Sequence, residues 1–122
     1  PAMFLYAAHF AALKIFDEAG WDNISAKQKL LTGYLWYLLD EINNSSDKKI
    51  IEFITPRNEK DRGCQLSMLM LQNGKEIYNG LMKQGIFTDW REPNVIRLAP
   101  VPLYNSFEEV WKFADALKKL IK

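Results

Sequence analysis

The sequence predicts an α/β sandwich of the α+β type, in which two N-terminal helices precede a small domain with the element order ββαββα. Two observations predict it. Apolar residues recur at helical spacing around residues 31–42 and 110–121, whereas shorter runs between them alternate or are rich in β-branched residues. A polar run at residues 43–49 separates a purely helical part from the part in which strands are expected.

The first expected helix, ending near Gly20, is apolar on almost every side. Such a helix must be covered all round, which a 122-residue domain does poorly for a helix at its own end. We therefore expect residues 1–20 to be the last helix of a missing large domain, and residues 21–122 to form the C-terminal small domain with its linking helix. The alternative is a central helix in a compact small domain.

A second helix is expected to begin within residues 23–28, where Ser25 and Gln28 have the spacing of a capping box. Its apolar stripe is predicted core: Leu31, Leu35, Leu38 and Ile42. Residues 43–49 are a polar loop and the only good linker candidate.

Two antiparallel strands are predicted next, at residues 50–55 and 64–71, with a charged loop between them. In the second strand Met68 and Met70 read as core fillers. Cys64 is expected to be a small buried residue, because no group nearby in sequence would activate its thiol.

The remaining elements are a helix at residues 76–84 ended by Gly85, strands at 86–90 and 95–99 around the turn 91–94, and a helix at 107–121. Ser106 and Glu109 form a capping box at the start of this last helix.

Arg97 interrupts the second of these strands. Alternation puts it on one face with Val95 and Ala99. The apolar residues Ile96 and Leu98 lie on the other face. An arginine in such a place needs an acidic or polar partner, and a guanidinium beside a proline-stiffened loop suits a carboxylate ligand. The alternative is an arginine at a strand end that reaches solvent or pairs with a neighbouring glutamate.

Several motifs resemble the C-terminal part of kynureninases. These enzymes depend on pyridoxal 5'-phosphate (PLP) and share fold type I, the fold of aspartate aminotransferase. The motifs are residues 97–107 (RLAPVPLYNSF), 62–66 (RGCQL), 91–93 (REP) and 31–35 (LTGYL). The resemblance spans nearly the whole chain and implies the C-terminal small domain of such an enzyme. Class V aminotransferases and cysteine desulfurases share a looser form of the motif, so a fragment of one of these is the enzymatic alternative.

The resemblance implies that the full-length enzyme is a cytoplasmic homodimer that hydrolyses L-kynurenine to anthranilate and L-alanine in tryptophan catabolism, using pyridoxal 5'-phosphate. L-kynurenine and 3-hydroxykynurenine both remain candidate substrates. By resemblance Arg97 binds the substrate α-carboxylate, while Pro100, Pro102 and Asn105 shape the supporting loop. Tyr104 reads as a packed loop aromatic rather than a group at the site.

The family's Schiff-base lysine, pyridine-nitrogen aspartate and phosphate-binding residues have no matching motif here. We therefore expect no catalytic or cofactor-binding residue in this chain, and no activity from it alone. A non-catalytic dimerisation or binding module is the alternative from another class.

The composition agrees with an ordinary globular domain, at 48% hydrophobic and 25% charged residues. Sixteen basic against fifteen acidic side chains predict neither a nucleic-acid nor a membrane partner. A single cysteine and a single histidine exclude an internal disulfide and argue against a metal site.

Overall fold

The computed structural model describes residues 2–121 of the chain. The order of its helices and strands is the predicted one: two helices, then ββαββα. The elements are α1 (Met3–Ala19), α2 (Trp21–Asn44), β1 (Ile51–Phe53), the short 3-10 helix η1 (Glu59–Asp61), β2 (Leu66–Met70), α3 (Gly74–Lys83), β3 (Asp89–Arg91), β4 (Val95–Leu98) and α4 (Phe107–Leu120).

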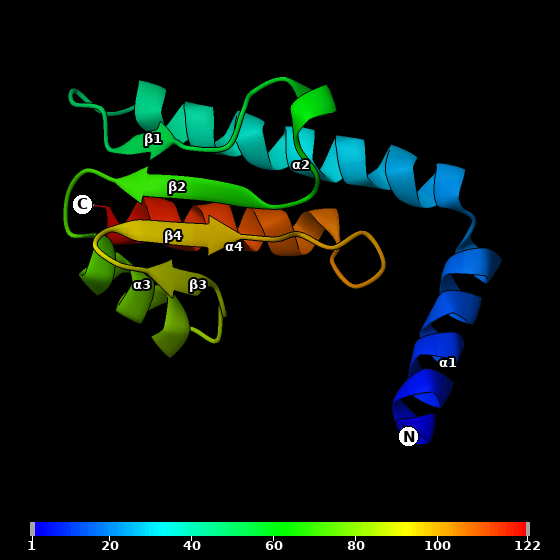
Figure 1. The fold of residues 1–122 in the computed structure, drawn as a ribbon. Helices are drawn as coiled ribbons and strands as arrows, with labels where there is room; N and C mark the ends of the chain where they lie inside the picture. Colours follow the sequence, from blue (N-terminus) through cyan, green and yellow to red (C-terminus); the bar gives the residue numbers. More distant parts are fainter. Residues whose placement is uncertain (1, 122) are drawn as a thin grey trace.

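The four strands form one antiparallel sheet in the order β1-β2-β4-β3. The predicted antiparallel pairing of the first two strands is confirmed. Figure 1 shows α4 behind the sheet and alongside α2, with α3 next to α4, and among residues 2–121 no helix crosses the front of the sheet. The predicted sandwich therefore has helices on one face of the sheet only.

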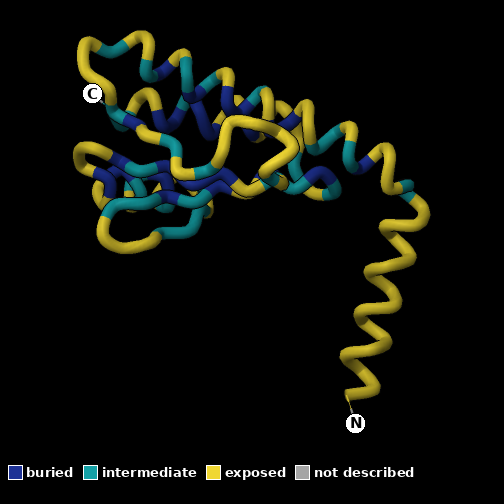
Figure 2. The backbone as a smooth tube through the Cα atoms, turned by 45° about the horizontal axis from the view of Figure 1, so that its top comes forward, coloured by how far each residue is buried: buried dark blue, intermediate teal, exposed yellow. Residues whose placement is uncertain are grey.

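The core lies between the sheet and these helices. The rear face of the sheet contributes apolar side chains that are fully buried, Met68 and Ile96 among them. The helices contribute Leu31, Leu35 and Leu39 from α2 and Val110, Phe113 and Leu117 from α4. Figure 2 shows the buried residues gathered in this layer. Burial of this apolar surface is the main favourable term in folding, and Met68 and Met70 are core residues as predicted.

Helix α1 lies outside this core. None of its residues is buried, and Phe4 is 89% exposed. Figures 1 and 2 show α1 pointing away from the sheet. Within residues 2–121 nothing covers its apolar surface, so the larger domain expected around it stays a prediction. No helix in this described part of the chain is long and apolar enough to cross a membrane.

The start of α2 differs from the prediction. Ser25 and Gln28 do not cap it, because α2 already begins at Trp21, directly after Gly20. Gly20 has a φ of 80°, a conformation that glycine adopts at little cost, and there the chain turns from α1 into α2. Gln28 lies inside the helix, where its amide donates to the Thr32 hydroxyl at 3.3 Å.

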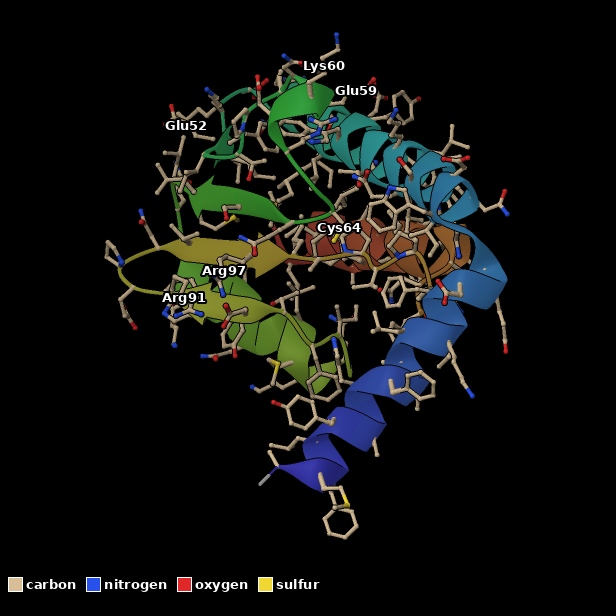
Figure 3. All side chains as sticks on the ribbon, turned by 45° about the vertical axis from the view of Figure 1, so that its right-hand side comes forward. Glu52, Glu59, Lys60, Cys64, Arg91 and Arg97 are labelled. Atoms are coloured by element: carbon tan, nitrogen blue, oxygen red, sulfur yellow. The ribbon has the colours of Figure 1, made fainter. Side chains whose placement is uncertain are left out.

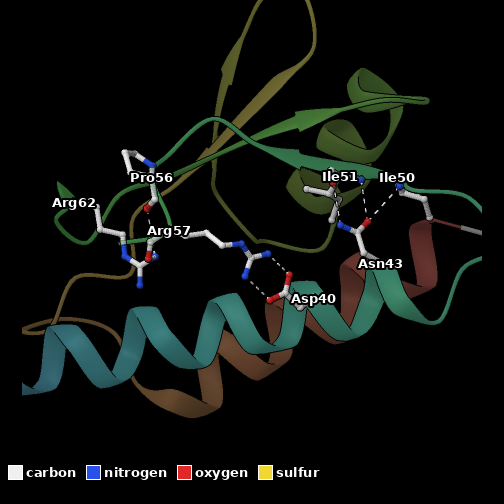
Figure 4. A network of polar contacts seen from close by, with 7 residues as sticks. All are labelled: Asp40, Asn43, Ile50, Ile51, Pro56, Arg57 and Arg62. Carbon is white, nitrogen blue, oxygen red and sulfur yellow. Dashed lines mark hydrogen bonds and ion pairs between the residues drawn. The ribbon is translucent and has the colours of Figure 1, made fainter. Parts of the chain in front are cut away.

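The polar loop after α2 is a closed turn rather than a linker. Asn43, still in the helix, accepts hydrogen bonds from the backbone N–H groups of Ile50 at 3.2 Å and Ile51 at 3.0 Å. Its own amide donates to the Ile51 carbonyl at 2.9 Å. Figure 4 shows this contact beside the two-point ion pair of Arg57 with Asp40, at 2.9 and 2.6 Å. These bonds attach β1 and the loop after it to α2.

Two further predictions need correction. Cys64 is half-buried rather than buried, because it lies before the start of β2 and outside the core. The strand expected at residues 86–90 is β3 at Asp89–Arg91, since Gly85 ends α3 with a φ of 76° and the next three residues are irregular.

Candidate functional site

The open face of the sheet carries Arg97 in the interior strand β4. Ile96 and Leu98 on either side of it are buried, and the Arg97 side chain is 34% exposed. The predicted alternation along this strand is therefore confirmed. Strand pairing places Ser67 of β2 opposite Arg97 on one side and Asp89 of β3 opposite it on the other.

Asp89 is the partner of Arg97. Arg97 Nε donates to Asp89 Oδ2 at 2.7 Å, and Arg97 Nη2 forms an ion pair with the same oxygen. Arg91 Nε also donates to this oxygen, at 3.0 Å. Figure 3 shows Arg91 and Arg97 on neighbouring strands. The Arg97 guanidinium first, and Arg91 second, hold the pKa of Asp89 below its usual value of 3.8, so Asp89 stays charged at neutral pH.

The pairing leaves one end of the Arg97 guanidinium without a protein partner in the described chain. Within residues 2–121 its hydrogen bonds and its ion pair all go to Asp89, through Nε and Nη2. A guanidinium has a second edge, formed by Nη1 and Nη2, that matches the two oxygens of a carboxylate. This edge can therefore bind a carboxylate while Asp89 remains in place.

The loop that follows β4 is held by one of its own side chains and by one side chain of α2. Asn105 Oδ1 accepts from the Val101 N–H at 2.8 Å, and Lys27 of α2 donates to the Pro102 carbonyl at 2.6 Å. Pro100 and Pro102 are both buried. The bond from Asn105 agrees with a role in shaping the loop, and the support of a ligand site by this loop stays a prediction.

The capping box predicted at the start of α4 is present. Glu109 N–H donates to Ser106 Oγ at 3.2 Å, and Ser106 N–H donates to Glu109 Oε2 at 2.8 Å. The Asn105 amide donates to the same carboxylate at 3.3 Å. The backbone bond from Ser106 first, and the bond from Asn105 second, hold the pKa of Glu109 below its usual value of 4.5. Loop and helix are thus joined at one carboxylate.

The exposure of Tyr104 differs from the prediction. This residue was expected to pack within the loop, but it is 81% exposed. Its backbone N–H bonds to the Val101 carbonyl, so the turn itself directs the ring outward. Behind the loop lies a small cavity of about 110 Å³ next to Leu98 and Pro100. Thr88 lines it, and its buried hydroxyl has no partner within residues 2–121.

The side chains around Arg97 fit a carboxylate ligand but do not fit pyridoxal phosphate. A Schiff base needs a lysine, and none contacts Arg97, Asp89 or Arg91 in the described residues. Six lysine side chains contact other groups, on Phe10, Pro102, Glu52, Trp90, Glu108 and Asp115. Residues 2–121 also contain no group of three or more His, Cys, Asp or Glu side chains that could hold a metal ion.

Comparison with known proteins places the chain in a family. Residues 24–117 match the kynureninase C-terminal domain. The chain belongs to this family. The kynureninase of Christiangramia forsetii is 46% identical over 113 residues, which are 93% of this chain and 26% of that protein. Human kynureninase is 40% identical over 126 residues, covering 99% of this chain and 27% of that protein. The chain thus spans about a quarter of the length of these relatives.

Solved structures share the fold. A NifS-like protein superposes with a TM-score of 0.73 at 20% identity, over 91% of this chain and 31% of that one. A phosphoserine aminotransferase from Cytophaga hutchinsonii gives a TM-score of 0.62 at 19% identity, over 89% of this chain and 29% of that one. At these identities the likeness concerns the fold, and it confirms the predicted α+β arrangement.

Asp89 and Arg91 were missed as site residues. The turn was expected to hold residues 91–94, which would pair Trp90 with Val95 and put Asp89 on the face opposite Arg97. In the structure Arg91 itself pairs with Val95, so Asp89 pairs with Arg97. A shift of one residue moves a whole strand's side chains to the other face, and the turn length sets that shift. The signal available in the sequence was the alternation of charge at Asp89 and Arg91.

Proposed function

We propose that this chain is the C-terminal small domain of a kynureninase, and that the full-length enzyme hydrolyses L-kynurenine to anthranilate and L-alanine with pyridoxal 5'-phosphate. The family membership supports the activity. The observation that carries the role of this chain is the unpartnered Nη1 end of Arg97 on the open face of the sheet. That end is the site for the substrate α-carboxylate.

In this proposal the chain binds and orients the substrate, and other parts of the protein supply the reactive groups. A two-point contact from Arg97 fixes both oxygens of the carboxylate, and the carboxyl group is attached to the α-carbon. The contact therefore restricts the orientation of the α-carbon and of the bond that must be aligned for reaction. The fixed loop from Pro100 to Asn105 follows Arg97 directly and limits movement of the strand end. The lysine that forms the Schiff base lies outside residues 2–121.

The arrangement of the whole enzyme is also part of the proposal. Residues 1–20 are its last large-domain helix, and residues 21–122 are the small domain with its linking helix. The exposed apolar side chains of α1 support this division, because a neighbouring domain would bury them. The enzyme is a homodimer in the cytoplasm and acts on L-kynurenine or its 3-hydroxy analogue within tryptophan catabolism.

Other class V enzymes and a non-catalytic module are less well supported. The likeness to the NifS-like protein rests on 20% identity, whereas the kynureninases reach 46% over nearly the whole chain. The relatives that match this chain carry the name kynureninase, which favours a part of an enzyme over a non-catalytic module.

The experiment is a comparison of two ligands on the full-length enzyme. Hydrolysis of L-kynurenine is measured as the release of anthranilate. In a second assay, the amine that lacks only the α-carboxylate is tested as a competitive inhibitor. We expect hydrolysis of L-kynurenine and at least tenfold weaker binding of the analogue, since a charge-assisted contact contributes about 1.5–3 kcal/mol. Equal affinity for the two ligands would contradict the proposed role of Arg97, and absence of hydrolysis would contradict the proposed activity.

A further inference from the structure

We propose that Asp89 is a positioning residue that holds the Arg97 guanidinium by its Nε edge so that the Nη1 end faces the ligand carboxylate. This inference rests on the proposed function and deepens it. The comparisons assign no role to Asp89, and the sequence interpretation named no aspartate beside Arg97: a neighbouring glutamate or solvent was only the alternative to a carboxylate ligand.

The contacts between Asp89 and Arg97 support this role. Asp89 uses a single oxygen, Oδ2, for both Nε and Nη2 of Arg97. These two nitrogens form the side edge of the guanidinium, so the plane and direction of the group are fixed while the far end stays available. A carboxylate that gripped Nη1 and Nη2 instead would block the edge that the substrate needs.

The two side chains come from rigid positions. Asp89 and Arg97 are directly opposite each other in the pairing of β3 with β4, so backbone hydrogen bonds set their separation. An arginine has many rotamers, and fixing one before the ligand arrives reduces the entropy lost on binding. Sites built on paired strands hold such geometry better than sites on loops.

Arg91 keeps the cluster attractive to an anion. Its Nε bonds to the same Asp89 oxygen at 3.0 Å, so two guanidinium groups share one carboxylate. The three side chains carry a net charge of +1. Asp89 therefore orients Arg97 without cancelling the field that a substrate carboxylate would meet.

A different role for Asp89 predicts a change in substrate affinity in the opposite direction. If Asp89 were an internal competitor that the substrate displaces from Arg97, its removal would strengthen substrate binding. Removing its charge would also favour an anion, by up to roughly threefold in water-like surroundings. Loss of a fixed arginine rotamer weakens binding roughly two- to tenfold. The two effects oppose each other in Asp89→Asn. Asp89→Glu keeps the charge and moves the carboxylate by one methylene group, so positioning predicts a higher KM in this variant and competition does not.

The test compares Asp89→Glu, Asp89→Asn and Glu92→Gln in the full-length enzyme. The last two changes replace a carboxylate by an amide in the same hairpin, and Glu92 contacts the Trp90 indole N–H at 2.8 Å rather than an arginine. We expect Asp89→Glu to raise the KM for L-kynurenine roughly two- to tenfold, with a smaller change in kcat. Asp89→Asn should raise it less, because loss of the negative charge offsets part of the effect. Glu92→Gln should leave both constants unchanged. The inhibition constant of the amine without an α-carboxylate should be the same in Asp89→Asn and wild type.

The outcomes that overturn the inference are distinct. A lower KM in Asp89→Glu would make Asp89 a competitor, and an unchanged KM with a lower Tm would make the pair merely structural. Combining Asp89→Glu with Arg97→Ala should add nothing to the KM of Arg97→Ala alone. An equal rise with and without Arg97 would overturn the inference and leave the proposed function standing, whereas a wild-type KM in Arg97→Ala would overturn both.

Discussion

The two faces of the sheet are made from alternate residues of the same strands, yet they differ in every property that matters for function. On the rear face Ile96 and Leu98 are buried against helices. On the front face the side chains of Arg97 and Asp89 remain partly exposed, and no helix in the described part of the chain crosses this face (Figure 1). The rear face holds the domain together. The front face is left free to meet a ligand, and an interior strand gives it a fixed position.

The largest effect expected from this comparison is on stability. Ile96→Ala should lower the free energy of unfolding of the 122-residue chain by about 2–5 kcal/mol, because Ile96 is fully buried and its removal leaves a cavity. Val95→Ala, one residue away on the half-buried front face, should cost about 1 kcal/mol or less. Urea unfolding of both variants measures the difference, and equal losses would show that the front face is also part of the core.

Arg97 itself should show the reverse pattern. Arg97→Lys keeps the charge but loses the two-point contact, so kcat/KM of the full-length enzyme should fall about ten- to a hundredfold. Arg97→Ala should lower it further. The Tm should change little in either variant, because the pair with Asp89 is partly exposed. Steady-state kinetics and thermal unfolding on the same preparations decide this. A fall of several degrees in Tm with normal turnover would make Arg97 a structural residue.

The rear face was more predictable than the front face, for physical reasons. Burial of Ile96, Met68 and Leu31 follows from hydrophobic periodicity, which needs no knowledge of neighbouring strands. The partner of Arg97 depends on the register of β3 against β4, and that register depends on one residue of turn length. Local patterns specify which face a residue lies on more readily than what lies opposite it.

The N-terminal ends of helices also show how far local sequence patterns can predict structure. The capping box of α4 was found correctly, because Ser106 follows a proline-rich loop that cannot continue a helix. The similar spacing of Ser25 and Gln28 was misleading, because residues 21–24 are equally compatible with a helix and Gly20 provides the break. A capping motif is decisive only where the residues before it are unable to be helical.

The cap of α4 joins the two faces, since it fixes the loop after Arg97 to a helix of the core. Ser106→Ala removes the hydroxyl that accepts from the Glu109 N–H, and should lower the free energy of unfolding by about 1 kcal/mol. Ser106→Asn, which can also cap a helix, is the matched control and should recover most of the loss. Denaturant unfolding of the 122-residue chain tests both, and an equal loss in the two variants would argue against the cap.

The smallest expected effect is a pH dependence at the same cap. The pKa of Glu109 is lowered by the bonds from Ser106 and Asn105, so the folded state binds a proton at Glu109 less readily than the unfolded state. The stability that Glu109 contributes is therefore complete above its usual pKa of 4.5 and is lost as the pH falls through the lowered value. Glu109→Gln should be less stable than wild type at neutral pH, and the gap in stability should close as the pH falls through the lowered pKa of Glu109. Ser106→Ala keeps the carboxylate and the backbone bond to it, so most of its pH dependence should remain. Wild type should retain further acid sensitivity from Asp89, whose pKa is also lowered. Urea unfolding at several pH values measures the gap, and a gap that stays constant from neutral to acid pH would show that the charge of Glu109 does not stabilise the cap.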